Sequence, residues 1–257
     1  MSKILSGLLM AGLLSISAQA DLLRVEMGGG VWQNELSGTI TSADTSGIVT
    51  QTFDTDLLNY DKESKGYAWL YIKHPLPVIP NLRLEYTAVD FSGTSTQSFT
   101  YQGETYQTNT QSDITMDQFD IIMYYNILDN TAWITLDLGL DIKVIQSEFN
   151  AKDMSTGLEV REKETLPVPM AYARVRFELP FDIGIEGIGK YSAYKNSKVI
   201  DYLVKVDYTL TDILPIDIGL EAGYRFEKLD INGDDFDIAT SGTLEIDGIF
   251  AGAVIRF

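Results

Sequence analysis

The chain has 257 residues, no cysteine and a formal net charge of −18. Without cysteine, we expect no disulfide, no thiol catalysis and no lipid anchor attached through cysteine. The acidic balance argues against nucleic acid as a partner, because nucleic acid is bound through a basic surface.

The first twenty residues follow the pattern of a secretory signal peptide. Lys3 supplies a positive charge, residues 4–16 are mostly apolar, and Ala18-Gln19-Ala20 is a small-residue cleavage site. The apolar stretch is shorter than the ~20 residues that a transmembrane helix needs. We therefore predict a signal peptide at residues 1–20, which the export machinery recognises, and a barrel domain at residues 21–257.

The rest of the sequence is dominated by a period of two in hydrophobicity. From 216 to 227, apolar residues fall on one parity, whereas Asp217, Glu221 and Arg225 fall on the other, which places them on opposite faces of a strand. Ten such segments lie at residues 22–33, 65–74, 82–91, 116–126, 132–149, 166–178, 182–193, 198–210, 216–228 and 243–257. In the second segment both parities are apolar, so the assignment of its faces stays open.

The connections alternate between short turns and long polar loops. The long ones cover residues 34–64, 92–115, 150–165 and 229–242. This alternation is typical of outer-membrane barrels, and an even strand number places both termini at the short-turn end. We predict an all-β, antiparallel up-and-down transmembrane β-barrel of ten strands, with eight or twelve as alternatives. Pro167 and Pro169 favour a later start for the sixth strand.

Aromatic residues distinguish this prediction from a soluble barrel, which would show the same alternation with its apolar face inward. They gather on the apolar parity near both ends of the strands, as in the aromatic belts of a membrane barrel. The periplasmic belt would comprise Tyr125, Phe177, Tyr208 and Phe257, and the outer belt Phe119, Tyr191, Tyr202, Tyr224 and Phe226.

The opposite parity carries charges on most segments, and in a membrane barrel this parity faces the lumen. The predicted lumen residues are Arg24, Glu26, Arg83, Glu85, Asp137, Lys143, Arg174, Arg176, Glu186, Lys190, Glu221 and Arg225. Barrels of about eight strands are filled by their side chains, so ten strands lie close to the filled case. These charges predict a plug of ion pairs or, alternatively, the lining of a narrow pore that an excess of acids would make cation-preferring.

The last segment ends in an aromatic residue that follows alternating apolar positions. Gly252, Ile255 and Phe257 fit the assembly signal of outer-membrane barrels, which the barrel-assembly machinery reads. This ending is meaningful because it accompanies a signal peptide and ten alternating segments. It therefore predicts a location in the cell outer membrane.

The first segment contains three consecutive glycines, Gly28, Gly29 and Gly30, within the stretch from Val25 to Trp32. Glycine in a strand allows bending and close approach of another group, which favours a structural reading over a ligand site. Together with the terminal Phe257, this stretch resembles a family of uncharacterised proteobacterial outer-membrane proteins. The resemblance implies a barrel surrounded by outer-membrane lipid and lipopolysaccharide, and it implies no activity.

The residues that could support catalysis or metal binding are few. The chain has one histidine, His74, beside Pro75 at a predicted periplasmic turn. The omptin proteases and the barrel lipases use a histidine at the outer rim, so His74 lies at the wrong end. The acidic run 230–237 departs from a calcium loop, because Gly233 and Ser241 occupy the wrong positions. We predict no enzyme, cofactor or metal, and a structural or surface-interaction role, with a narrow pore as the alternative.

Overall fold

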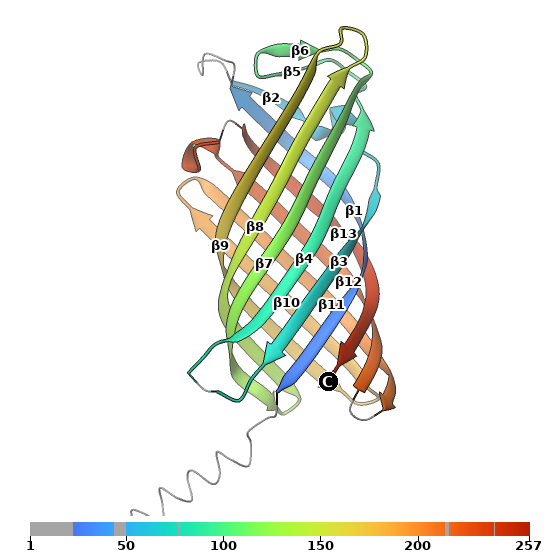
Figure 1. Cartoon of the computed structure of the whole chain (residues 1–257), viewed down its shortest axis with the longest axis vertical. Coiled ribbons are helices and arrows are strands. Elements are labelled where there is room, and N and C mark those ends of the chain that lie inside the picture. The colour runs from blue at the N-terminus through green and yellow to red at the C-terminus, as the bar shows by residue number, and fades with distance from the viewer. Residues whose placement is uncertain (1–22, 44–49, 77, 214–215, 239) are drawn as a thin grey trace, which may run out of the picture.

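The computed structural model describes residues 23–43, 50–76, 78–213, 216–238 and 240–257. The predicted signal peptide lies outside these residues and stays a prediction. Ten long strands of the described chain pair antiparallel, each with the next and the last with the first (Figure 1). They are β1 (Arg24–Ala43), β3 (Glu63–Lys73), β4 (Asn81–Thr94), β7 (Thr110–Thr131), β8 (Ile134–Asp153), β9 (Glu159–Leu179), β10 (Ile183–Tyr194), β11 (Ser197–Ile213), β12 (Ile216–Ile231) and β13 (Thr240–Arg256). The predicted ten-stranded barrel is confirmed.

The barrel closes where its first and last strands meet. β13 pairs with β1 in one continuous register from Glu26 to Ser42 of β1. At the end of this ladder, the Phe257 N–H donates to the Val25 carbonyl at 2.8 Å. The start of β1 and the C-terminus therefore lie at the same end of the barrel. We call this end periplasmic and the other end extracellular, as in bacterial outer-membrane barrels.

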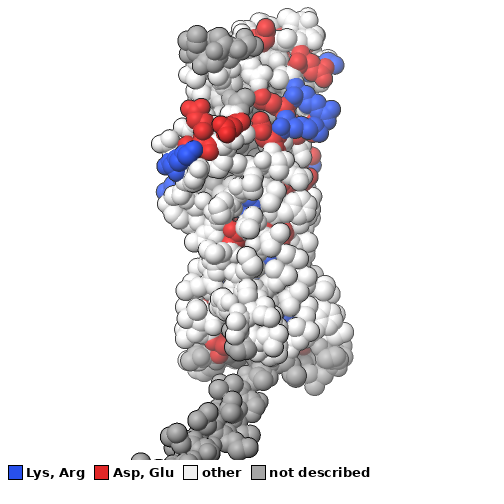
Figure 2. Space-filling view, turned by 60° about the vertical axis from the view of Figure 1, so that its left-hand side comes forward, with Lys and Arg blue, Asp and Glu red and all other residues white. Residues whose placement is uncertain are grey.

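In the half of the barrel near the periplasmic end, the outward face is apolar and the inward face is polar. On β8, the outward side chains from Ile134 to Val144 are all isoleucine, leucine or valine, whereas Asp137, Asp141 and Lys143 are buried inside. In Figure 2 the surface of this half carries few charged side chains. Most of the charged side chains in that view lie toward the extracellular end. This distribution is the one that a membrane-spanning barrel requires.

The predicted aromatic belts lie on the outward face. Among their members, Phe119, Tyr125, Phe177, Tyr191, Tyr202, Tyr208, Tyr224 and Phe257 are exposed, and Phe226 is half-buried beside Tyr202. The second segment, which the sequence left ambiguous, forms β3 with Trp69 and Tyr71 inside and Ala68 exposed on the opposite face.

The strands extend further at the extracellular end than the sequence predicted. Much of the predicted loops 92–115 and 150–165 is strand, because β7 begins at Thr110, β8 continues to Asp153 and β9 begins at Glu159. The predicted loops 34–64 and 229–242 are shortened in the same way, by β1, β3, β12 and β13. The predicted loop lengths were therefore wrong, and the extracellular β8–β9 and β10–β11 connections are shorter than the periplasmic β3–β4 connection.

The late start predicted for the sixth strand is also wrong, because β9 contains both Pro167 and Pro169. β10 pairs with β9 only between Ala171 and Leu179, so both prolines lie where β9 has a free edge on that side. Residues of one parity direct their N–H groups to the same neighbour. The two missing N–H groups can therefore face the free edge, where proline costs no ladder bond.

Above the apolar band, the hydrophobic pattern of the strands inverts. On β7, Ile114 and Met116 are buried inside, whereas the outward neighbours Asp113 and Asp117 are acidic. The row that joins Phe119, Val144 and Pro167 across β7, β8 and β9 marks the change from apolar to polar on the outer face. Beyond this row the wall has the arrangement of a soluble protein, polar outside and apolar inside.

Short elements of the extracellular connections complete this second, apolar core. They are β2 (Thr50–Asp54), η1 (Thr55–Leu58), the β5–β6 hairpin (Phe99–Tyr101, Glu104–Tyr106) and η2 (Gly233–Asp235). The Phe99 ring lies 4.9 Å from that of Phe53 and stacks on Tyr106 at 5.2 Å. In the described part of the chain, no helix is long and apolar enough to cross a membrane.

Candidate functional site

Charged side chains from most strands meet inside the membrane-spanning half of the barrel. All twelve predicted lumen residues lie on the inward parity: ten are buried, Glu85 is nearly so, and Arg24 is half-exposed at the periplasmic mouth. Further buried charged residues on the inward parity were not among the predicted site residues. They include Asp120, Asp141, Asp201, Lys205, Asp207 and Glu227. Their inward parity was the signal that could have identified them.

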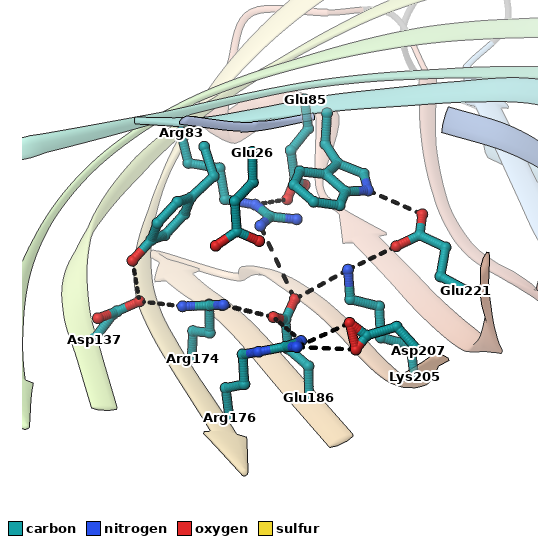
Figure 3. A network of polar contacts seen from close by, with 12 residues as sticks. Glu26, Arg83, Glu85, Asp137, Arg174, Arg176, Glu186, Lys205, Asp207 and Glu221 are labelled. Atoms are coloured by element: carbon teal, nitrogen blue, oxygen red, sulfur yellow. Dashed lines mark hydrogen bonds and ion pairs between the residues drawn. The ribbon is translucent and has the colours of Figure 1, made fainter. Parts of the chain in front are cut away.

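Glu186 on β10 is the centre of a lower cluster (Figure 3). Its carboxylate lies 2.7 Å from the Arg174 guanidinium and 3.3 Å from Lys205 Nζ. The same carboxylate is 3.5 Å from Arg176 and 4.0 Å from Arg83. Arg83 belongs to β4, which does not neighbour β10 in the sheet, so this contact spans the lumen.

Each of these four cations also has a second carboxylate. The pairs are Arg174 with Asp137 at 2.7 Å, Lys205 with Glu221 at 2.8 Å, Arg176 with Asp207 at 2.8 Å and Arg83 with Glu85 at 2.5 Å. A buried charge is tolerated only when it is paired and hydrogen-bonded. The lower cluster meets that condition by linking strands from opposite sides of the barrel.

Two lysines organise an upper cluster. Lys143 Nζ on β8 donates to Asp201 at 2.9 Å and to Glu227 at 2.8 Å, which lie on the non-neighbouring strands β11 and β12. Lys190 Nζ on β10 donates to Glu85 of β4 at 2.6 Å and to Asp120 of β7 at 2.8 Å. Both lysines are almost completely buried, so the two ion-paired groups cross the lumen at this level.

Aromatic rings fill the space beside the lower cluster. The Trp69 ring lies 4.2 Å from Lys205 Nζ and 4.8 Å from the Arg83 guanidinium carbon, and its indole N–H donates to Glu221 at 3.0 Å. These are cation–π contacts in addition to the ion pairs. A Cβ added at Gly28 would lie 2.5 Å from this ring. Gly28 therefore makes room for the indole, in line with the structural reading of the glycine stretch.

The acids and bases of the described lumen are nearly balanced. The lumen residues named so far include ten carboxylates and eight cations, and Arg256 at the periplasmic mouth, which is paired with Glu26 and Asp207, makes nine. The excess of acid on the chain as a whole is thus located mainly outside the lumen. Chemically, the arrangement can cross-link the barrel and obstruct its axis.

The remaining candidate groups are engaged in hydrogen bonds within or between turns. His74 Nε2 is 3.1 Å from the Pro80 carbonyl, and its Nδ1 accepts from the Leu76 N–H at 3.2 Å, in the periplasmic turn after β3. In the acidic run, Asp235 accepts from Asn196 N and Ser197 Oγ of the neighbouring hairpin. Among the residues that the structure describes, no group of three His, Cys, Asp or Glu side chains could hold a metal ion.

Comparison with known proteins identifies the class of fold. The chain is similar to the outer-membrane protease OmpT from Escherichia coli, with a TM-score of 0.51, 11% identity and coverage of 93% of this chain and 97% of that one. It also matches the translocator domain of the autotransporter NalP from Neisseria meningitidis at a TM-score of 0.40 and 13% identity, covering 100% and 97%. The first likeness supports the fold, a closed outer-membrane-type barrel. No family model and no curated protein sequence matches the chain.

Proposed function

We propose that this chain is an outer-membrane barrel with a closed lumen that performs no catalysis and presents its extracellular end for structural or surface contacts. The observation that carries the proposal is the network of ion pairs across the lumen, centred on Glu186 below and on Lys143 and Lys190 above. An open, wet pore does not need such pairing, because water would solvate the charges.

The outer surface supports the location. The apolar band and its aromatic belts match lipid, and the polar wall above them matches the aqueous side of the membrane. Outer-membrane lipid and lipopolysaccharide are the surroundings this implies. The export machinery and the barrel-assembly machinery are the partners that a signal peptide and a terminal Phe257 imply, and Phe257 is hydrogen-bonded to β1 in the closed barrel.

Conductance of single barrels in a planar bilayer tests the closed lumen. Insertion is first verified by a heat-modifiable gel shift of the same preparation, because a protein that failed to insert would also be silent. We expect no steady openings from inserted wild-type protein. Steady, ohmic openings would overturn the closed lumen and favour the alternative, a narrow pore for ions or small solutes.

The charge balance of the lumen and one further assay address the alternatives. A pore lined by a clear excess of acids would prefer cations, and the near balance of lumen charges does not favour that property. Catalysis is tested by assaying peptide and lipid A substrates with purified wild-type protein and with His74→Ala. We expect no turnover from either, and turnover lost in His74→Ala would overturn the non-catalytic role.

A further inference from the structure

An apolar cavity of about 150 Å³ lies inside the extracellular end of the barrel. Its lining includes Met116 of β7, Ile145 of β8, Leu166 of β9 and Leu229 of β12, all buried. A cavity of about this volume with mainly apolar walls accepts a molecule about as large as benzene. The cavity therefore suits a hydrocarbon group of about six carbons.

The floor of the cavity is the upper charged cluster. Ile145 and Leu229 each lie two residues beyond a member of that cluster on the same strand and face, namely Lys143 and Glu227. The Lys143–Glu227 ion pair, 2.8 Å long, closes the lumen directly below these apolar side chains. The cavity is thus a pocket that ends inside the barrel, separate from any path through it.

The wall of the barrel is low on one side of this cavity. β9 has no β10 partner from Glu159 to Met170, because the β10–β11 hairpin turns at Tyr194–Ser197. On the side of the β10–β11 hairpin away from β9 lies the turn that contains η2. Asp235 of this turn accepts hydrogen bonds from the hairpin. Between the free edge of β9 and the η2 turn, the strand wall thus ends at the β10–β11 hairpin, and we call this low stretch of the wall the notch.

The notch opens at the level of the outer aromatic belt. Pro167 of β9 lies in the row where the outer face changes from apolar to polar, and Tyr191 near the end of β10 belongs to the belt. A group that enters the notch from the side therefore comes from the outer surface of the membrane.

The charged side chains that line the cavity are acidic. Glu162 and Glu164 of β9 line it, and within the described chain neither has an ion pair. Their basic neighbours Arg161 and Lys163 lie on the outward parity, where both bind Glu148 at 2.6 Å. Tyr101, Gln102 and Thr240 donate hydrogen bonds to Glu162, but burial still raises the pKa of this carboxyl, so a cation beside it would favour the charged form.

We propose that this cavity binds a small cationic amphiphile, a hydrocarbon group of about six carbons that carries an ammonium group. The hydrocarbon fills the apolar pocket above the charged cluster, and the ammonium group pairs with Glu164 and Glu162 at the mouth. An anionic amphiphile of the same length is disfavoured by the same two carboxylates. The site does not depend on whether the lumen below it conducts.

Binding of hexylammonium to the barrel in lipid nanodiscs tests the proposal, with empty nanodiscs as the control for partitioning. We expect saturable binding that is about tenfold tighter than that of hexan-1-ol or hexanoate, since a charge-assisted contact adds that much. Leu166→Trp should fill the cavity and abolish binding, whereas Ala171→Trp, on the lipid-facing side of the same strand, should leave it unchanged. Dodecylammonium mixed into the nanodisc lipid should displace hexylammonium through the notch.

Glu164→Gln separates the charge contribution from the shape of the cavity. This variant should bind hexylammonium no more tightly than hexan-1-ol, with the affinity for hexan-1-ol unchanged. Hexylammonium uptake equal to that of empty nanodiscs would overturn the proposal, and so would unchanged binding in Leu166→Trp or a preference for hexanoate. Failure of dodecylammonium to compete would overturn entry from the membrane. None of these binding results bears on the closed lumen, which is tested separately by the absence of conductance in a planar bilayer.

Discussion

Replacing Lys143 with methionine removes the charge at the centre of the upper cluster while keeping an unbranched side chain that is one atom shorter. Asp201 would still have Arg225 at 2.7 Å, and Asp120 would still have Lys190 at 2.8 Å. Glu227 would keep only the Gln118 amide at 2.6 Å, with no cation within 4.0 Å in the described chain. One uncompensated buried carboxylate predicts a loss of about 3–5 kcal/mol in the free energy of unfolding.

Urea unfolding of the barrel in lipid vesicles, followed by tryptophan fluorescence, measures this loss. Adding Glu227→Gln to Lys143→Met should recover at least about 1 kcal/mol, because the orphaned charge is removed and the amide can pair with Gln118. A loss below about 1 kcal/mol in Lys143→Met, the scale of exposed ion pairs, would refute the reasoning. It would mean that water reaches the cluster.

Three other outcomes are expected. Gly28→Ala should destabilise the barrel by about 1–3 kcal/mol in the same unfolding assay, because its methyl would lie 2.5 Å from the Trp69 ring. The pKa of Glu148, measured by carbon-detected NMR, should be about 2 instead of 4.5, because Lys163 and Arg161 donate to its carboxylate. The stabilisation that these ion pairs give is complete above pH 4.5 and is lost as the pH falls toward 2. Deleting Phe257 should lower the amount of barrel found in outer-membrane fractions while leaving refolding in detergent nearly unchanged.

Each of these three predictions has a control or an outcome that would contradict it. Gly66→Ala should be nearly neutral, since only one atom, 4.0 Å away, lies near the added methyl, and an equal loss at both glycines would remove the role given to the indole. Lys163→Gln should raise the pKa of Glu148, and a wild-type midpoint near 4.5 would show that the ion pairs do not form. Loss of detergent refolding without Phe257 would indicate a general role in stability.

The sequence predicted the membrane-spanning half of the barrel well because one rule applies throughout it. Apolar side chains face lipid and polar ones face the lumen, so strands such as β8 and β12 alternate cleanly up to Val144 and Phe226. The same rule failed at the extracellular end. There the apolar parity changes, as at Ile114 and Met116, and a strand that continues through the change looks like the start of a loop.

The sequence predicted which residues face the lumen, but it did not predict which of them contact one another. Parity identified Glu186 and Lys143 as inward-facing, but alternation carries no information on which strands face each other across a closed barrel. The pairing of Lys143 with Glu227 depends on strand tilt and closure, which appear only in three dimensions. The apolar cavity was missed for a related reason, because its lining combines side chains of seven strands, and beside it the wall is low at the short β10–β11 hairpin.

Accessibility of a single cysteine tests the closed lumen most directly. The chain has no cysteine of its own, so Thr87→Cys would introduce the only thiol. Thr87 is 2% exposed and accepts from Arg225 at 2.7 Å inside the lumen. In folded barrels in vesicles, a small charged thiol reagent added to either side should leave this cysteine unmodified, while Ser155→Cys in the exposed β8–β9 turn reacts fully. Labelling of Thr87→Cys in the folded barrel at a rate close to that of Ser155→Cys would contradict a closed lumen.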